Sequence, residues 1–279
     1  MYKSVVLGCV NVDVPLLEGI ALAGRHGFQG IEVPPDGAAL IGEDKVRDAL
    51  AQWGLNNAGF ALPLAYKAAD KAEFEAGAEQ LKTMAETAAR LGGKGCYTWI
   101  TPWHETMTYQ QHFDFMVERL GRYAAILKEF GIALGLEFVG VQKARDTHPN
   151  PFIYNIPQML ELCDAIGTGN CGLLLDCHHC YTAGHDMKDV YGLKKEQIVL
   201  VHVNDAVDGY TLAEQPDNPR AMPRETGVLD IDTFMDALVK IGYEGPVAVE
   251  PFSPKLKAME DNDAKLDLTM EALNSIWPA

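Results

Sequence analysis

The chain has 279 residues, of which 48% are hydrophobic, so it can bury a sizeable core. Its 23 basic and 39 acidic residues give a formal charge of −16. Such a surface repels phosphate backbones and anionic lipid, so we expect neither nucleic acid nor membrane as a partner. A small anionic substrate stays compatible with this charge, because it meets only its local pocket.

Six cysteines are dispersed along the chain. Four of them lie in or beside predicted strands, where free cysteine behaves as a small hydrophobe: Cys9, Cys96, Cys171 and Cys177. A chain this rich in apolar residues needs no disulfide staples, so we expect reduced thiols and a cytoplasmic protein. The opening residues, MYKSVVLGCV, lack the apolar stretch and cleavage site of a signal peptide. No window approaches the roughly 18 apolar residues of a transmembrane helix.

Short apolar runs alternate with segments of helical spacing, most of which end at a glycine. In chain order, the predicted strands and following helices are 4–7 and 15–26, 30–33 and 43–53, 55–62 and 71–91, 95–100 and 110–130, 132–138 and 156–166, 173–175 and a short helix within 188–195, 198–203 and 232–241, 246–249 and 259–276. Alternating strand and helix units predict a parallel sheet. Eight in succession, without a linker, predict an α/β fold: a single (β/α)8 TIM-barrel domain over residues 1–279. The first strand is not followed by Gly-x-Gly-x-x-Gly, which argues against a dinucleotide-binding sheet.

Four consecutive predicted strands carry an acid or a histidine at their carboxyl ends. IALGLEFVG places Glu137 there, CGLLLD places Asp176, IVLVHVND places His202, and GPVAVEPF places Glu250. These strand ends form the working face of a (β/α)8 barrel, and neighbouring strands lie about 4.8 Å apart. We therefore expect the four side chains to bind one divalent metal ion. Three carboxylates and one imidazole suit Mn²⁺ first, with Mg²⁺, Co²⁺ or Zn²⁺ as alternatives.

This predicted metal site suggests a reaction. An ion with open positions polarises a substrate carbonyl and acidifies the neighbouring C–H group. Glu137 and Glu250 could then abstract and return that proton. Taken alone, each glutamate could be a barrel acid paired with a lysine, and His202 could be a satisfied core histidine. Recurrence at four successive strand ends favours the joint site.

Other polar residues near the strand ends are candidate substrate contacts, each with a structural alternative. His104, beside Trp103, could form a sugar-stacking wall or be an exposed loop residue. Glu32, at the end of the second strand, could touch substrate or bond a backbone amide. Arg220 and Arg224 follow the seventh strand, and either could reach a substrate oxygen or balance surface acids.

Two histidine-containing segments are less informative. The run from Cys177 to Cys180 resembles half of a zinc knuckle, but a structural zinc site needs a second ligand pair and none lies nearby in the sequence. We therefore do not expect structural zinc, and His178 receives no role. His148, in the loop RDTHPNPF, is interpreted as structural.

The motifs LGLEFVG, LLLDCHHC, LVHVND and VAVEPF resemble the xylose-isomerase-like TIM-barrel superfamily, within its sugar phosphate isomerase/epimerase branch, over essentially the whole chain. The resemblance to its ketose 3-epimerases implies that Glu137, Asp176, His202 and Glu250 hold the ion and that the two glutamates are the acid/base pair. It also implies that His179 binds a substrate oxygen. The superfamily's arginine precedes a PGEG-like turn; here the turn reads PRETG, which leaves Arg220 and Arg224 as candidates.

Members of the superfamily include ketose epimerases, aldose–ketose isomerases, inosose dehydratase, subunits that cleave 3-oxo-glycosides and zinc-dependent DNA repair nucleases. The charge of −16 and the sparse histidines argue against a nuclease. We expect an isomerase or epimerase of a ketose or related keto-sugar, with proton transfer through a cis-enediolate. The first alternative is a lyase that uses the same enolate for dehydration or 3-oxo-glycoside cleavage. The second is a non-catalytic sugar-binding partner subunit. Assembly as a homodimer or homotetramer is also expected from the resemblance.

Overall fold

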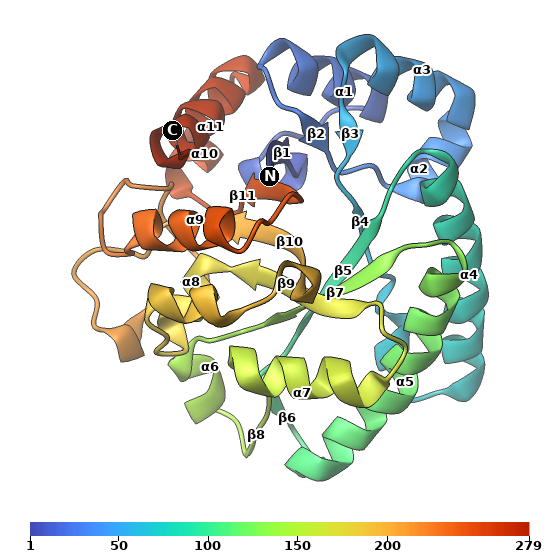
Figure 1. Cartoon of the computed structure of the whole chain (residues 1–279), viewed down its shortest axis with the longest axis vertical. Helices are drawn as coiled ribbons and strands as arrows, with labels where there is room; N and C mark the ends of the chain where they lie inside the picture. The colour runs from blue at the N-terminus through green and yellow to red at the C-terminus, as the bar shows by residue number, and fades with distance from the viewer. Residues whose placement is uncertain (279) are drawn as a thin grey trace.

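The computed structural model describes residues 1–278, and its centre is a nine-stranded parallel sheet surrounded by helices (Figure 1). The strands are β1 (Tyr2–Val5), β2 (Gly30–Ile31), β3 (Asn56–Asn57), β4 (Phe60–Ala61), β5 (Gly95–Ile100), β7 (Ala133–Phe138), β9 (Cys171–Asp176), β10 (Ile198–Val203) and β11 (Pro246–Val249). Their order is β3-β2-β1-β11-β10-β9-β7-β5-β4. A separate antiparallel pair joins β6 (Trp103–His104) to β8 (Asn150–Pro151).

The two ends of this sheet are consecutive in the chain, because only Ala58 and Gly59 separate β3 from β4. β3 pairs with β2, and β4 pairs with β5. Ala58 donates its N–H to Ile31 O (2.9 Å), and Gly59 O accepts the N–H of Val33 (3.1 Å). The predicted strand 55–62 is therefore one kinked strand that closes the sheet, and counting it once confirms the (β/α)8 barrel.

The kink occurs at a glycine that no other residue could replace without strain. Gly59 has φ +124°, and a Cβ added there would lie 2.9 Å from Gly95 O. The close approach of these two backbones holds the broken strand against β5.

The helices follow the predicted pattern, with several additional short elements. They are α1 (Leu16–Arg25), α2 (Pro35–Ile41), α3 (Glu43–Trp53), α4 (Lys71–Arg90), α5 (Tyr109–Glu129), α6 (Gln142–Asp146), α7 (Ile156–Ile166), α8 (Cys177–Thr182), α9 (Ile231–Lys240), α10 (Pro254–Ala258) and α11 (Asn262–Ile276). The predicted bounds of α3 and α7 agree with the structure. Within residues 1–278, α2, α6, α8 and α10 have no counterpart in the prediction.

Local capping explains two further differences. The predicted helix 259–276 begins at Asn262 instead of Met259, because Asp261 accepts the N–H of Asp263 (2.9 Å) and caps the start of α11. The predicted helix within 188–195 is a 3₁₀ turn, η3 (Met187–Gly192), whose first turn Asp186 caps.

The core fills the barrel and the layer between barrel and helices. Leu173, Leu174 and Leu175 of β9 are all buried, which explains an apolar run without alternation. α5 begins with a capping box, in which Thr108 and Gln111 satisfy each other's backbone N–H groups. None of the helices within residues 1–278 combines the length and apolar character needed to cross a membrane.

Candidate metal centre

Four neighbouring strands bring Glu137, Asp176, His202 and Glu250 together. β11, β10, β9 and β7 are adjacent in the sheet, and His202 lies in register with Asp176. Glu250 follows β11, where its N–H donates to Val203 O (3.1 Å). One ligand atom from each of the four residues lies within 4.8 Å of the others. The outer two strands carry the glutamates, so these flank the cluster from opposite sides.

The two glutamates differ strongly in their electrostatic surroundings. Burial raises the pKa of Glu137 well above its usual range, and the charges of Glu250 and Asp176 raise it further. Burial acts in the same direction on Glu250, but His202 and Arg220 outweigh it and lower the pKa of Glu250 to about 2. His202 Nδ1 lies 3.3 Å from Glu250 Oε2 and 3.8 Å from Glu137 Oε1. One glutamate is therefore biased toward the protonated form and the other toward the carboxylate.

Arg220 is a buried member of the same cluster. Its Nη1 donates to Asp176 Oδ2 and to Glu250 Oε2, both at 2.9 Å. Its Nη2 donates to Asp217 Oδ1 at 3.0 Å. Arg224, in contrast, lies on the surface and pairs with Asp232. Of the two candidate arginines, the structure brings only Arg220 to the site.

Asp176 has several partners besides any ion. Its Oδ1 accepts the N–H groups of His178 (2.6 Å) and His179 (3.2 Å), and this contact starts α8. Together with Arg220, these bonds satisfy a carboxylate that is otherwise fully buried. Asp176 therefore does not need a metal ion to satisfy its hydrogen-bonding groups.

The unpaired groups are on the neighbouring strands, and they fit a cation. Within residues 1–278, Glu137 Oε1 and both ring nitrogens of His202 are buried without a hydrogen-bond partner. When ionised, three carboxylates against the single guanidinium of Arg220 leave two uncompensated negative charges. Oxygen ligands with one nitrogen and a net negative charge suit a divalent cation.

A cavity of about 190 Å³ opens above the cluster. Its lining combines polar groups with apolar walls: Trp99, Glu137, Val139, His179, Asp217, Arg220, Glu250 and Phe252. His179 Nδ1 accepts the N–H of Gly140 (3.3 Å), which leaves Nε2 facing Arg220 Nη2 at 3.1 Å. Its place in the lining is compatible with the substrate contact implied by the resemblance.

Four lining residues are absent from the sequence-based prediction: Trp99, Val139, Asp217 and Phe252. Trp99 precedes the last residue of its strand and is 45% exposed, but a tryptophan in a predicted strand gives no sign of its direction. Phe252 adopts φ +42°, and this strain has no sequence signature. Asp217 lies in a loop where no local pattern points to the site.

The remaining candidates lie elsewhere. His104 Nδ1 accepts the N–H groups of Thr106 (3.1 Å) and Met107 (2.9 Å), so this side chain organises its own loop outside the cavity lining. Trp103 stacks on His148 at 3.5 Å instead of on the cavity wall. Glu32 lines a neighbouring cavity, beside Pro34.

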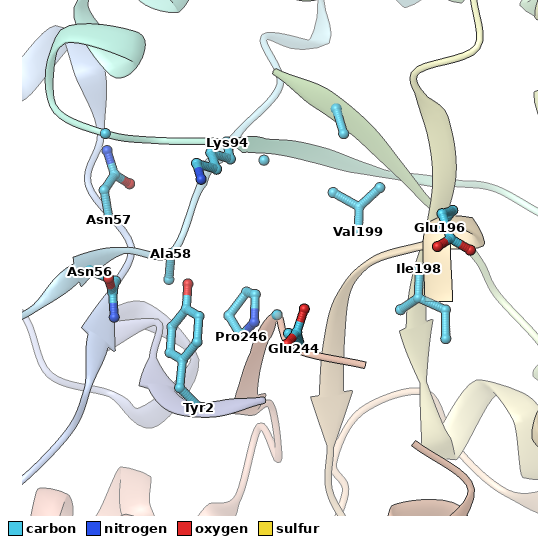
Figure 2. A pocket seen from close by; sticks show the side chains of 14 residues that line it. Tyr2, Asn56, Asn57, Ala58, Lys94, Glu196, Ile198, Val199, Glu244 and Pro246 are labelled. Carbon is cyan, nitrogen blue, oxygen red and sulfur yellow. The ribbon is translucent and has the colours of Figure 1, made fainter. Parts of the chain in front are cut away.

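A cavity of about 370 Å³, larger than the one above the cluster, lies at the opposite end of the barrel, and Figure 2 shows the side chains that line it. Tyr2, Lys94 and Glu244 line it at the amino ends of the strands, whereas the ligand cluster lies at their carboxyl ends. In barrels of this type that end contributes to stability, whereas chemistry occurs at the carboxyl ends. Cavity size alone therefore does not locate the site.

Comparison with known proteins agrees with this architecture. The sequence profile of a family described as "Xylose isomerase-like TIM barrel" matches residues 20–276. An inosose isomerase from Halalkalibacterium halodurans is 30% identical over 161 residues, which cover 57% of this chain and 54% of that protein. A ketose 3-epimerase from Arthrobacter globiformis is 26% identical over 83% of this chain and 76% of that protein. The structure of a xylose isomerase domain protein from Alicyclobacillus acidocaldarius superposes with a TM-score of 0.87 at 26% identity, covering 99% of this chain and 98% of that one.

Proposed function

Because the chain belongs to the xylose isomerase-like TIM barrel family, we propose that it is a divalent-metal-dependent isomerase or epimerase of a ketose or related keto-sugar. The observation that carries the proposal is the cluster of Glu137, Asp176, His202 and Glu250 at adjoining strand ends. Relatives named as an inosose isomerase and a ketose 3-epimerase support the reaction class. The matched segment spans about half of that inosose isomerase, so the substrate is part of the proposal.

The four cluster residues would hold the ion, with Mn²⁺ as our first expectation. When bound, the ion supplies Lewis acidity that makes the hydrogen beside a ketone more acidic. Arg220 and His179 face the same cavity and would orient substrate oxygens. Trp99, Val139 and Phe252 provide apolar walls for the C–H faces of a sugar and exclude water.

Glu137 and Glu250 are the proposed proton carriers. They enter from the outer strands of the cluster, so they face a substrate between them from two sides. A carboxylate on one side removes the proton, and a carboxylic acid on the other can return one with inverted configuration. Return from the same side would give isomerisation instead.

Solvent isotope incorporation tests the proposal. Protein loaded with Mn²⁺ in D₂O should introduce deuterium beside the carbonyl of at least one member of a panel containing D-fructose, D-tagatose and 2-keto-myo-inositol, measured by proton NMR. Glu250→Gln should lower the rate by at least about a hundredfold, since it removes an acid/base group. Glu244→Gln is the matched control, because Glu244 is 85% exposed and lies beside the opposite cavity. Full activity of Glu250→Gln, or no incorporation across the panel, contradicts the proposal.

A further inference from the structure

A second cavity, of about 250 Å³, lies on the same face of the barrel between the loops that follow β1 and β2. Its lining contains one ionisable side chain, Glu32, among apolar and backbone groups: Leu7, Gly8, Val12, Val14, Leu16 and Pro34. A carboxylate in an apolar cavity accepts hydrogen bonds from hydroxyl groups and repels anions. The cavity therefore favours a neutral group with hydroxyls over an anionic group.

The sheet places this cavity beside the metal cluster. β1 pairs with β11, where Ser4 is opposite Ala248, and β2 pairs with β1. Glu32, directly after β2, is thus two strand spacings from Glu250, or about 10 Å. Cys9 lies between them, with Sγ 3.6 Å from Glu250 Oε1. This span is comparable with the length of a hexose or a cyclitol.

Glu32 has an unused hydrogen-bonding position. Its Oε2 is buried without a partner in the described part of the chain. Burial raises the pKa of Glu32 to about 7; the charge of His202 acts to lower this pKa, and the charge of Glu250 acts to raise it. The Glu32 carboxyl group therefore interacts electrostatically with two residues of the metal cluster. A buried acceptor without a partner is unfavourable, and a substrate hydroxyl that donates to it would remove this cost.

We propose that this cavity is a subsite for the end of the substrate remote from the reacting carbonyl, and that Glu32 selects an unphosphorylated sugar or cyclitol. A hydroxyl there donates to Glu32, whereas a phosphate meets a carboxylate without a counter-charge in the cavity lining. The inference rests on the proposed function for the position of the reacting carbonyl. It adds the charge class of the substrate and the residue that selects it.

The test compares D-fructose with D-fructose 6-phosphate. In wild-type protein loaded with Mn²⁺, D-fructose should bind more tightly than its phosphate, measured by competition in saturation-transfer NMR. Glu32→Gln keeps the shape and removes the charge, so it should reduce this preference at least tenfold. If the panel gives turnover, the ratio of kcat/KM for the two forms of the active ketose should change in the same direction. An unchanged ratio, or a wild-type preference for the phosphate, would overturn the inference.

A steric variant tests the cavity independently of Glu32. A Cβ built at Gly8 meets no atom within 4 Å, so the backbone there accepts a side chain and Gly8→Val adds volume at the cavity. It should raise KM, or the dissociation constant of D-fructose, at least fivefold with little change in kcat. Gly121→Val is the control, because Gly121 is equally unhindered but lies on α5. Equal effects of the two variants would refute the subsite. Absence of isotope exchange with intact sugar binding would instead refute only the proposed reaction.

Discussion

Replacing Arg220 by methionine should destabilise the metal-free protein strongly and tighten metal binding at the same time. The guanidinium lies 2.9 Å from carboxylate oxygens of both Asp176 and Glu250 and is only 3% exposed. Removing one partner of a buried ion pair costs about 3–5 kcal/mol, because the other charge stays buried. For a chain of this size, that corresponds to a fall in Tm of roughly 10 °C.

The same substitution increases the negative charge that a cation meets. With Arg220 gone, all three carboxylates face the ion without a competing positive charge. Two charges about 4 Å apart in a partly buried site interact by about 4 kcal/mol, so the affinity for Mn²⁺ should rise at least tenfold. Saturating Mn²⁺ should then restore more stability to the variant than it adds to the wild type.

Calorimetric melting with EDTA and with MnCl₂, combined with titration calorimetry for the metal Kd, measures both effects. Arg224→Met is the matched control in the same loop, since Arg224 forms an exposed pair with Asp232 and should contribute at most about 1 kcal/mol. Equal losses of stability in the two variants, or an unchanged metal Kd in Arg220→Met, would refute the prediction that Arg220 neutralises Asp176 and Glu250 in the metal-free site.

Three further changes probe the scaffold. Asp205 accepts four backbone N–H groups of the loop that carries Arg220, so Asp205→Ala should lower the free energy of unfolding by about 3 kcal/mol in urea titrations; a loss below 1 kcal/mol would contradict this role. Burial, followed by the charges of His104 and Lys67, lowers the pKa of His112 to about 4. The free energy of unfolding should therefore decrease as pH falls from 6.5 toward 4, by at most about 3 kcal/mol. His112→Phe should flatten the dependence of the free energy of unfolding on pH in this range, and an unchanged slope would contradict the prediction. Gly59→Ala should cost about 1–3 kcal/mol because of its positive φ, and a neutral result in thermal melts would argue against the tight closure at β3–β4.

The parts of the fold that sequence could predict are those governed by local periodicity. The bounds of β5, β10 and β11 agree with the prediction, because each is an apolar run limited by turn residues. The grouping of Glu137 with Glu250 followed from a general property of parallel barrels, whose strand ends meet at one face. No distance information was needed for that step.

The parts that sequence could not predict depend on contacts between distant segments. Arg220 and Arg224 are four residues apart in one loop, and only the packing of that loop on Asp205 decides which one turns inward. The start of α8 was missed because its cap, Asp176, was interpreted solely as a strand-end ligand. The cavity beside Glu32 combines two loops whose proximity follows from sheet order.

The hydrogen-bond ladder of the barrel is unevenly distributed around its circumference. β2, β3 and β4 contribute two residues each, whereas β5, β7, β9 and β10 contribute six each. Amide protons of the short strands should therefore exchange with solvent sooner than those of the long ones. Three of the four cluster residues, Glu137, Asp176 and His202, lie on the six-residue strands, whereas Glu32 follows β2, which has two residues. We therefore expect local opening of the backbone to be more frequent beside Glu32 than beside the ligand cluster, which hydrogen exchange would measure.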